Sequence, residues 1–247
     1  MTPESVAAAS ELLPTYGALV VNPKLKDYVL DRDGFEIYPK AFPFSSAMVD
    51  KLVKHAGRRE LWKHSYIFND ADLLDAKNDK KRAQVPLCQF NDPGVDALHD
   101  LIDAKLFELF PHCRSRDTVL LRSLPRCGPQ KAHTDYLEAD WVSVKDASVP
   151  MSCVIALMPD TYFDAWPGAI NCFQRPSKGT QYKHLLLKLD AGDMLVFRGD
   201  FVHGGSSFRE FNIRIHTFLD VPSVQRVPNT TFYMDEEEWI LPRASKH

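Results

Sequence analysis

The chain has 247 residues, an apolar fraction of 45% and a formal net charge of -3, with an isoelectric point near 6.3. A chain of this length and composition can bury a full hydrophobic core, which argues against wholesale disorder and indicates one domain. Its nearly balanced charge provides no overall basic field that would recruit nucleic acid or an anionic membrane surface.

The cysteines indicate free thiols in a reducing compartment. Their spacing is irregular and contains no Cys-x-x-Cys pair, which argues against a disulfide framework or a zinc ribbon: they are Cys88, Cys113, Cys127, Cys153 and Cys172. The first residues lack the basic start and apolar run of a signal peptide, and no apolar stretch is long enough to span a bilayer. We therefore expect an intracellular, cytoplasmic protein with no membrane partner.

The first 114 residues are predicted to be mostly helical or irregular. One helix is expected over residues 45–56, with Ser45 or Ser46 as its N-cap. Asp92-Pro93 opens a second helix, whose apolar stripe consists of Val95, Leu98, Ile102, Leu106 and Leu109. The charged segment 77–82 between them is interpreted as a solvated turn rather than a nucleic-acid patch.

Short apolar runs dominate the second half of the chain, and Gly, Pro and Asp separate them. The runs cover residues 118–124, 151–158, 169–173, 184–189, 194–197 and 211–219. Regular short strands with turn signals predict an all-β sandwich or barrel. We expect a single domain over residues 1–247, with a β core at 115–222, the flank 1–114 packed on it, and a peripheral tail at 223–247.

A candidate metal site begins at His133-Thr134-Asp135. Residues two apart in a strand point to the same face, so the imidazole and the carboxylate can converge on one point. His203 follows another β run, from which a barrel could bring it back to this pair. Two histidines and one carboxylate on one face of an ion form the facial triad of non-haem Fe(II) oxygenases, which leaves positions open for O2 and a co-substrate. His-x-Asp alone is common by chance, so the prediction depends on the whole pattern.

Arg214 completes this pattern, eleven residues after His203 and within a segment that alternates as a strand. A guanidinium at such a position is suited to bidentate binding of a dicarboxylate. Arg209 is the alternative because it lies nearer to His203, but its surroundings, Ser206-Ser207-Phe208, indicate a turn. Arg122, before the His-x-Asp segment, either reaches the cofactor or an acidic substrate, or is simply solvated.

The order of these residues resembles the Fe(II)/2-oxoglutarate-dependent dioxygenase superfamily, and within it the phytanoyl-CoA dioxygenase-like proteins. The segments 154–160 and 192–197 resemble that family's strand before the substrate loop and its strand ahead of the distal histidine. The resemblance covers roughly residues 118–220. The loop 162–167 and the turn 176–179 depart from the family pattern, so the family's substrates are not implied.

The resemblance implies a mainly β fold with flanking helices and a double-stranded β-helix, or jelly-roll, core. It implies that His133, Asp135 and His203 hold Fe(II) and that Arg214 binds 2-oxoglutarate, with His216 and Arg122 as further cofactor-binding candidates. The implied reaction consumes O2, releases succinate and CO2, and hydroxylates a substrate C–H bond through a ferryl-oxo intermediate. The carboxylate ligand favours hydroxylation over halogenation, because a halide would need that ligand position.

Aromatic side chains near the expected site favour a small molecule with an apolar body as substrate. The candidate substrate contacts are Tyr136, Trp141 and Asn171, and the other aromatic residues considered are Tyr162, Phe163 and Trp166. Three alternatives stay open: the same chemistry on a nucleobase or a protein side chain, a cupin-like metal-binding protein without 2-oxoglutarate, and a catalytically silent β-barrel binding module. Release of succinate would distinguish the enzyme from the last two.

Overall fold

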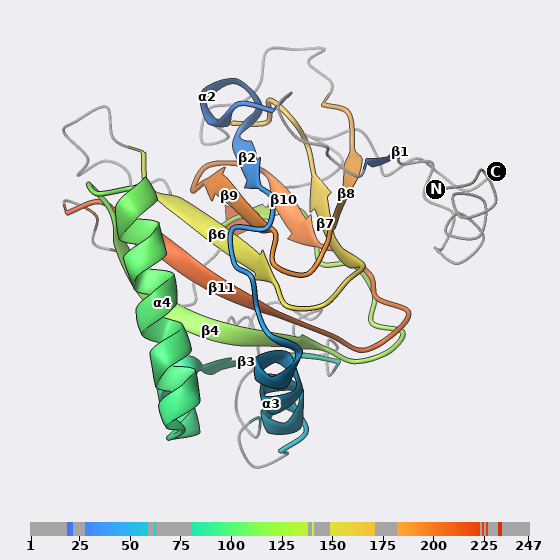
Figure 1. Cartoon of the computed structure of the whole chain (residues 1–247). Helices are drawn as coiled ribbons and strands as arrows, with labels where there is room; N and C mark the ends of the chain where they lie inside the picture. Colours follow the sequence, from blue (N-terminus) through green and yellow to red (C-terminus); the bar gives the residue numbers. More distant parts are fainter. Residues whose placement is uncertain are drawn as a thin grey trace.

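The computed structural model describes residues 19–21, 28–58, 62, 81–137, 140, 149–170, 182–222, 224, 226 and 232–233. Within these ranges the chain forms two six-stranded sheets, with the longer helices on one side (Figure 1). The predicted mainly β fold with flanking helices and a jelly-roll core is confirmed.

One sheet, which we call the helix-covered sheet, is antiparallel throughout, with the order β2-β9-β6-β11-β4-β3. Its strands are β2 (Phe35–Tyr38), β9 (Met194–Arg198), β6 (Met151–Ala156), β11 (Asn212–Asp220), β4 (Arg114–Ser123) and β3 (Arg82–Pro86). Both edge strands precede residue 115, so the first part of the chain extends this sheet as well as covering it. Four or five residues are too few for the sequence pattern to reveal such strands.

The other sheet carries both metal-site histidines, and we call it the ligand sheet. Its order is β1-β8-β7-β10-β5-β12, and its strands are β1 (Leu19–Val21), β8 (Leu185–Leu189), β7 (Thr161–Ala165), β10 (His203–Gly205), β5 (His133–Thr134) and β12 (Phe232–Tyr233). β12 comes from the predicted tail and pairs with β5. Most of the loop expected at 162–167 belongs to strand β7. In the strand expected at 169–173, residues 169–170 do not pair into a sheet, and residues 171–173 lie outside the described residues.

Both predicted helices are confirmed, and their caps explain where they begin. α3 (Ser46–Ala56) starts after Ser45, whose side chain accepts a hydrogen bond from the Met48 amide at 3.3 Å. α4 (Pro93–Leu109) starts after Asp92, which accepts from the Gly94 amide at 2.8 Å. Shorter turns form α2 (Leu30–Asp33) and the 3-10 helix η2 (Leu87–Phe90). Among the described helices none has the length and apolar character needed to cross a membrane.

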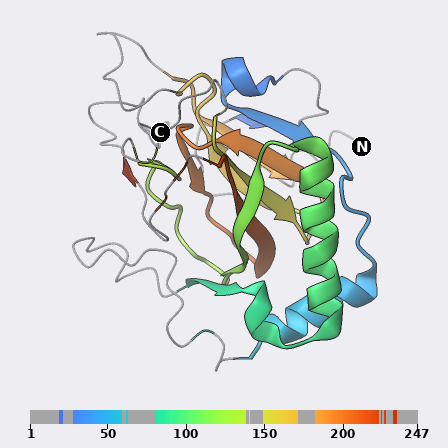
Figure 2. The same ribbon diagram turned by 90° about the vertical axis from the view of Figure 1, so that its left-hand side faces the viewer.

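Two apolar layers lie on the two faces of the helix-covered sheet. On the outer face, α3 and α4 share one apolar cluster with strands β3, β4, β6, β9 and β11, and Figure 2 shows α4 lying along this face. The inner face meets the ligand sheet, and side chains of both sheets fill the space between them. Burial of each large apolar side chain stabilises the fold by about 1.5–3 kcal/mol, so both layers contribute to stability.

The alternation of β11 decides which of its residues face the other sheet. Ile213 and Ile215 belong to the outer layer beneath the helices. Arg214 and His216 pair with Ala156 and Val154 of β6, whose side chains belong to the inner layer. Successive residues of a strand point to opposite faces, so the arginine and the histidine both face the interior between the sheets.

Candidate metal centre

Three predicted ligands meet at one point inside the protein. One nitrogen or oxygen atom from each of His133, Asp135 and His203 lies within 4.8 Å of the corresponding atoms of the other two. Asp135 Oδ1 is 3.3 Å from His203 Nε2 and 3.9 Å from His133 Nε2. Donors at right angles around an ion, each about 2.1 Å from it, lie about 3 Å apart, so this spacing suits a metal ion with cis ligands.

The ligand sheet brings these residues together through its register. His203 of β10 is directly opposite His133 of β5, and their ring centroids are 4.4 Å apart. Asp135 follows β5 immediately and is two residues from His133, which keeps its carboxylate on the same side. Both histidines and the aspartate are buried.

A backbone carbonyl orients each histidine ring. Nδ1 of His133 donates to the Lys131 carbonyl at 2.7 Å, and Nδ1 of His203 donates to the Phe201 carbonyl at 3.0 Å. Because a carbonyl oxygen can only accept, Nδ1 of each ring carries a proton, and Nε2 is the nitrogen that each ring directs toward Asp135 and could offer to a metal ion. Burial, and then the neighbouring His203, lower the pKa of His133 to about 3, so this ring is neutral and ready to bind a metal.

The carboxylate of Asp135 is held as an anion. Burial alone would raise its pKa, but the charge of His203 and hydrogen bonds from His203 and His216 hold the pKa well below the ordinary range. A buried carboxylate needs a compensating positive charge, and a cation bound among the three side chains would supply it. The donor set therefore fits a divalent metal ion with nitrogen and oxygen preference.

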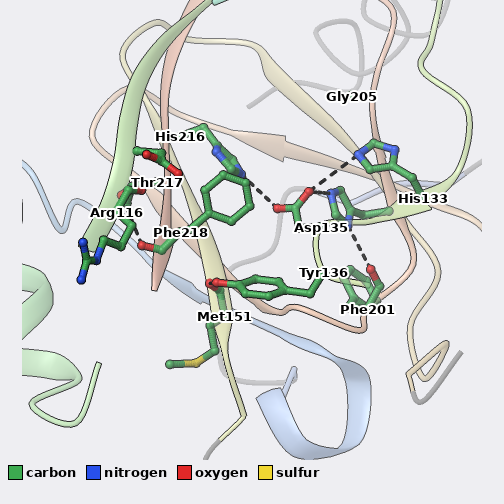
Figure 3. A network of polar contacts seen from close by, with 12 residues as sticks. Arg116, His133, Asp135, Tyr136, Met151, Phe201, Gly205, His216, Thr217 and Phe218 are labelled. Atoms are coloured by element: carbon green, nitrogen blue, oxygen red, sulfur yellow. Dashed lines mark hydrogen bonds and ion pairs between the residues drawn. The ribbon is translucent and has the colours of Figure 1, made fainter. Parts of the chain in front are cut away.

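His216 approaches Asp135 from the side opposite to His133 (Figure 3). Its Nε2 is 3.0 Å from Asp135 Oδ2, whereas Oδ1 is the oxygen that faces His203 and His133. The sequence predicted His216 as a contact for the cofactor. In the structure the ring nitrogen instead binds the carboxylate of a predicted metal ligand.

Aromatic rings surround His203. Phe163 stacks on it with an interplanar angle of 9° and a centroid distance of 5.1 Å, and Phe197 lies at 4.4 Å. Among the described aromatic residues that the sequence predicted near the site, Phe163 is the one that contacts a predicted metal ligand. Trp166 packs on His184 in a separate apolar cluster, and Tyr162 lies 6.4 Å from Phe208.

Arg214 is buried on the inner face, with 3% of its surface exposed. Its Nη1 donates to Ser123 Oγ at 3.0 Å, and its guanidinium lies over the ring of Phe208 at 5.2 Å. The alternative candidate, Arg209, is exposed in the turn between β10 and β11. The structure therefore places Arg214, and not Arg209, on the same interior face as His216.

Arg122 does not join the other predicted site residues. Its partner in the β4–β11 register is Ile213, so it faces the helices. There its Nη1 donates to the Ala56 carbonyl at 2.9 Å, and its guanidinium lies 4.2 Å from the centre of the Trp62 ring. The prediction that Arg122 contacts the cofactor fails because the register turns the side chain to the outer face.

Tyr136 follows Asp135 in sequence but belongs to the core. It is fully buried, and its hydroxyl lies 2.9 Å from the Met151 carbonyl and 2.7 Å from Asp220 Oδ1, as Figure 3 shows for the Met151 side. A side chain enclosed in this way does not line a substrate pocket, which corrects the predicted role. The other two predicted substrate contacts, Trp141 and Asn171, lie outside the described residues.

Arg82 supports the centre and was missed in the sequence. It was assigned to a solvated turn, yet it begins β3 and is 2% exposed. Its Nη2 donates to the carbonyls of Gly128, Gly205 and Ser206, which connects the chain before His133 to the chain after His203. These partners are 46 to 124 residues away, so no local pattern could have revealed the contact.

Neither the sequence models of known protein families nor the sequences of curated proteins match this chain. Solved structures do match it. The epimerase SnoN, in complex with Fe3+, alpha ketoglutarate and nogalamycin RO, has 14% identity and a TM-score of 0.55 over 85% of this chain and 94% of that one. HygX from Streptomyces hygroscopicus, with nickel and 2-oxoglutarate bound, has 14% identity and a TM-score of 0.52 over 85% and 96%.

A third similar structure extends the range of reactions among these proteins. It is the non-heme alpha ketoglutarate dependent carbocyclase SnoK from nogalamycin biosynthesis, with 15% identity and a TM-score of 0.51 over 77% of this chain and 81% of that one. The chain therefore has the fold of the non-haem 2-oxoglutarate-dependent enzymes. Identities this low establish the shared fold, and the chemistry must be argued from the residues of the site.

Proposed function

We propose that this protein is an Fe(II)- and 2-oxoglutarate-dependent oxygenase that oxidises a small organic molecule. The observation that carries the proposal is the convergence of His133 Nε2, His203 Nε2 and Asp135 Oδ1 on one buried point. Two imidazoles and one carboxylate on one face are the donor set of non-haem Fe(II) oxygenases. The shared fold with enzymes crystallised with iron or nickel and 2-oxoglutarate supports the same assignment.

The second half of the proposal assigns 2-oxoglutarate to Arg214. This guanidinium is buried on the interior face, two residues from His216 on the same strand, with the hydroxyl of Ser123 at 3.0 Å. A buried guanidinium binds a carboxylate in a bidentate manner, and a hydroxyl beside it can donate to the same group. We assign Arg214 to the far carboxylate of 2-oxoglutarate, and assign Fe(II) to the three ligands.

When bound, Fe(II) and 2-oxoglutarate supply the activation of O2, with release of succinate and CO2. The chain's own contribution is to position and to shield. The carbonyls of Lys131 and Phe201 fix the two imidazoles as neutral ligands. Phe163 and Phe197 pack on His203, which excludes water from that side of the centre.

We propose hydroxylation of a small molecule as the specific reaction. SnoN and HygX were crystallised with nogalamycin RO and hygromycin B, which supports a small organic substrate rather than a macromolecule. SnoN and SnoK are named epimerase and carbocyclase, so the fold alone does not choose the outcome. The mass of the product distinguishes the three: hydroxylation adds one oxygen atom, epimerisation changes nothing, and cyclisation removes two hydrogen atoms.

The experiment that tests the proposal measures metal binding and turnover together. Anaerobic titration should give about one Fe(II) per chain, and the loaded protein should form succinate from 2-oxoglutarate in O2, faster with substrate present. His133→Ala, Asp135→Ala and His203→Ala should each remove both properties, whereas Arg209→Ala, an exposed position, should leave them intact. Full iron occupancy in all three ligand variants would refute the assignment, and iron binding without succinate would favour a cupin-like metal protein.

A further inference from the structure

His216 has one feature that the proposed chemistry does not use. Its ring is on the inner face of β11, and 13% of its side-chain surface is exposed. Its Nε2 lies 3.0 Å from Asp135 Oδ2. An oxygen of a carboxylate that binds a metal ion can only accept a hydrogen bond, so Nε2 is the donor in this contact.

The two oxygens of Asp135 are therefore divided between two partners. Oδ1 faces the imidazoles of His203 and His133, at 3.3 and 3.9 Å, and Oδ2 faces His216. A carboxylate can bind a metal through one oxygen or through both. When one carboxylate oxygen accepts a hydrogen bond from a fixed donor, that oxygen stays bound to the donor, and the other oxygen is left to bind the metal.

Packing fixes the donor in place. The ring of Phe218 meets the His216 ring edge-on, with a centroid distance of 4.8 Å and an interplanar angle of 84°, and Phe197 lies at 6.4 Å. Both aromatic residues are on the helix-covered sheet, whereas Asp135 follows a strand of the ligand sheet. The bond from His216 to Asp135 therefore joins the two sheets at the metal centre.

We propose that His216 is a positioning residue that holds Asp135 as a one-oxygen ligand, which keeps three positions on the metal open. The inference rests on the proposed function, because it assumes that the three-donor site binds a metal. Three positions are what a two-oxygen co-substrate and O2 together require. If Asp135 bound through both oxygens, one of those positions would be lost.

The test compares variants that keep or lose the donor. In His216→Gln the side-chain amide nitrogen is the same number of bonds from Cβ as Nε2, so the donor is kept. His216→Phe keeps a ring of similar size without a donor. The matched control is His55→Phe, because His55 Nε2 also binds a carboxylate, that of Asp92, at 3.2 Å, and its ring also contacts a phenylalanine, Phe90, at 5.0 Å, within the helical flank.

Two quantities are measured with and without 2-oxoglutarate. The first is the dissociation constant for Fe(II) and for Co(II), and the second is the visible absorption of the Co(II) protein, which depends on the coordination number of the ion. His216→Phe should weaken metal binding by about 10- to 100-fold, the usual effect of losing a group that orients a ligand, and should change the Co(II) spectrum. His216→Gln should stay close to the wild-type values, and His55→Phe should match wild type in metal affinity and spectrum.

Wild-type metal affinity and spectrum in His216→Phe would overturn the inference, as would weaker 2-oxoglutarate binding with an unchanged spectrum. If His216→Phe does not fold, His216→Gln is compared with His216→Asn, because the shorter asparagine cannot reach Asp135. Equal metal affinities of these two variants overturn the inference, and weaker metal binding by the asparagine variant supports it. A wild-type protein that binds Co(II) but forms no succinate would refute the proposed oxygenase function while leaving the role of His216 measurable.

Discussion

Arg122 and Arg214 lie on the paired strands β4 and β11 but belong to different regions of the molecule. The register sets Arg214 opposite Leu121 and Arg122 opposite Ile213. This offset of one residue turns the two guanidinium groups to opposite faces of the helix-covered sheet. Arg122 contacts a helix carbonyl and Trp62, whereas Arg214 lies between the sheets beside Ser123 and Phe208.

The two arginines therefore have different roles. On the outer face the guanidinium of Arg122 joins a strand to α3 and supports the fold. On the inner face Arg214 shares its side with His216 and, through it, with the metal centre. The residue type is the same at the two positions, and the face of the strand is what distinguishes the partly buried structural arginine from the buried candidate binding arginine.

The largest expected difference between the two faces is in binding of 2-oxoglutarate. Arg214→Ala should weaken it by tens- to thousands-fold, since losing one partner of a buried charge pair costs roughly 2–5 kcal/mol. Iron binding should persist, because none of the three ligands is changed. Isothermal titration of the metal-loaded protein with 2-oxoglutarate measures both quantities, with Arg122→Ala as the matched control. If Arg122→Ala weakens 2-oxoglutarate binding as much as Arg214→Ala does, the distinction between the faces fails.

Gly199→Ala tests whether Tyr136, which follows the predicted ligand Asp135, supports the fold rather than the metal site. A Cβ on Gly199 would lie 2.3 Å from the Tyr136 ring, and that ring is fully buried. The overpacked variant should lose about 1–3 kcal/mol of unfolding free energy. Iron affinity, measured under conditions where the variant is folded, should stay near that of the wild type. Gly128→Ala is the control, because a Cβ there meets nothing within 4 Å. A stable Gly199→Ala protein with weakened iron binding would instead place Tyr136 in the site.

A smaller change is expected on the outer face. Arg122→Ala removes the bond to the Ala56 carbonyl and the contact with the Trp62 ring. Together these should cost about 1–2 kcal/mol of stability, from one hydrogen bond and one partly buried cation–π contact. Urea denaturation measures the loss, with the exposed Arg209→Ala as a control that should change little. Unchanged stability in Arg122→Ala would show that the outer guanidinium contributes nothing to the fold.

The smallest effect concerns pH. Burial first, and then Asp220, raise the pKa of Tyr136 well above its ordinary value, so the native state favours the neutral phenol. This stability is fully present below the unfolded pKa of about 10 and is lost as the pH rises above it. Tyr136→Phe should lower the free energy of unfolding by about 1 kcal/mol near neutral pH. Between about pH 9 and 11 the free energy of unfolding should fall by less in this variant than in the wild type. Parallel alkaline losses in both proteins would contradict this account.

The sequence was informative wherever the signal was local. Caps at Ser45 and Asp92 predicted where two helices begin, and His-x-Asp predicted two ligands because a strand places residues two apart on one side. His203 and Arg214 were proposed because each lies in or just after an apolar run, and their order along the chain then matched that of a known superfamily. The caps and His-x-Asp depend on residues that are close in the chain, whereas His203 lies 70 residues after His133 and was linked to it only by the overall pattern.

What the sequence could not supply was register between distant strands. The face of Arg122 depends on its pairing with Ile213, 91 positions later, and the bond from His216 to Asp135 joins residues 81 apart. The role of Arg82 depends on carbonyls at least 46 residues away. Propensity and periodicity carry no information about such partners, so these residues were assigned to the cofactor or to solvent.

The pairing of the strands also has a consequence for how the protein folds. Phe35 of β2 pairs with Phe197 of β9, 162 residues later, and His133 pairs with His203, 70 residues later. Contacts this distant in sequence form slowly, because long loops must close before the pairing stabilises them. The proposed ligands come from two strands that meet only when these loops have closed, so under the proposed function we expect metal to bind late, after the sheets have assembled. An ion that binds only the assembled state at 100 times its dissociation constant adds about 2.7 kcal/mol to stability, which makes metal occupancy a measure of completed folding.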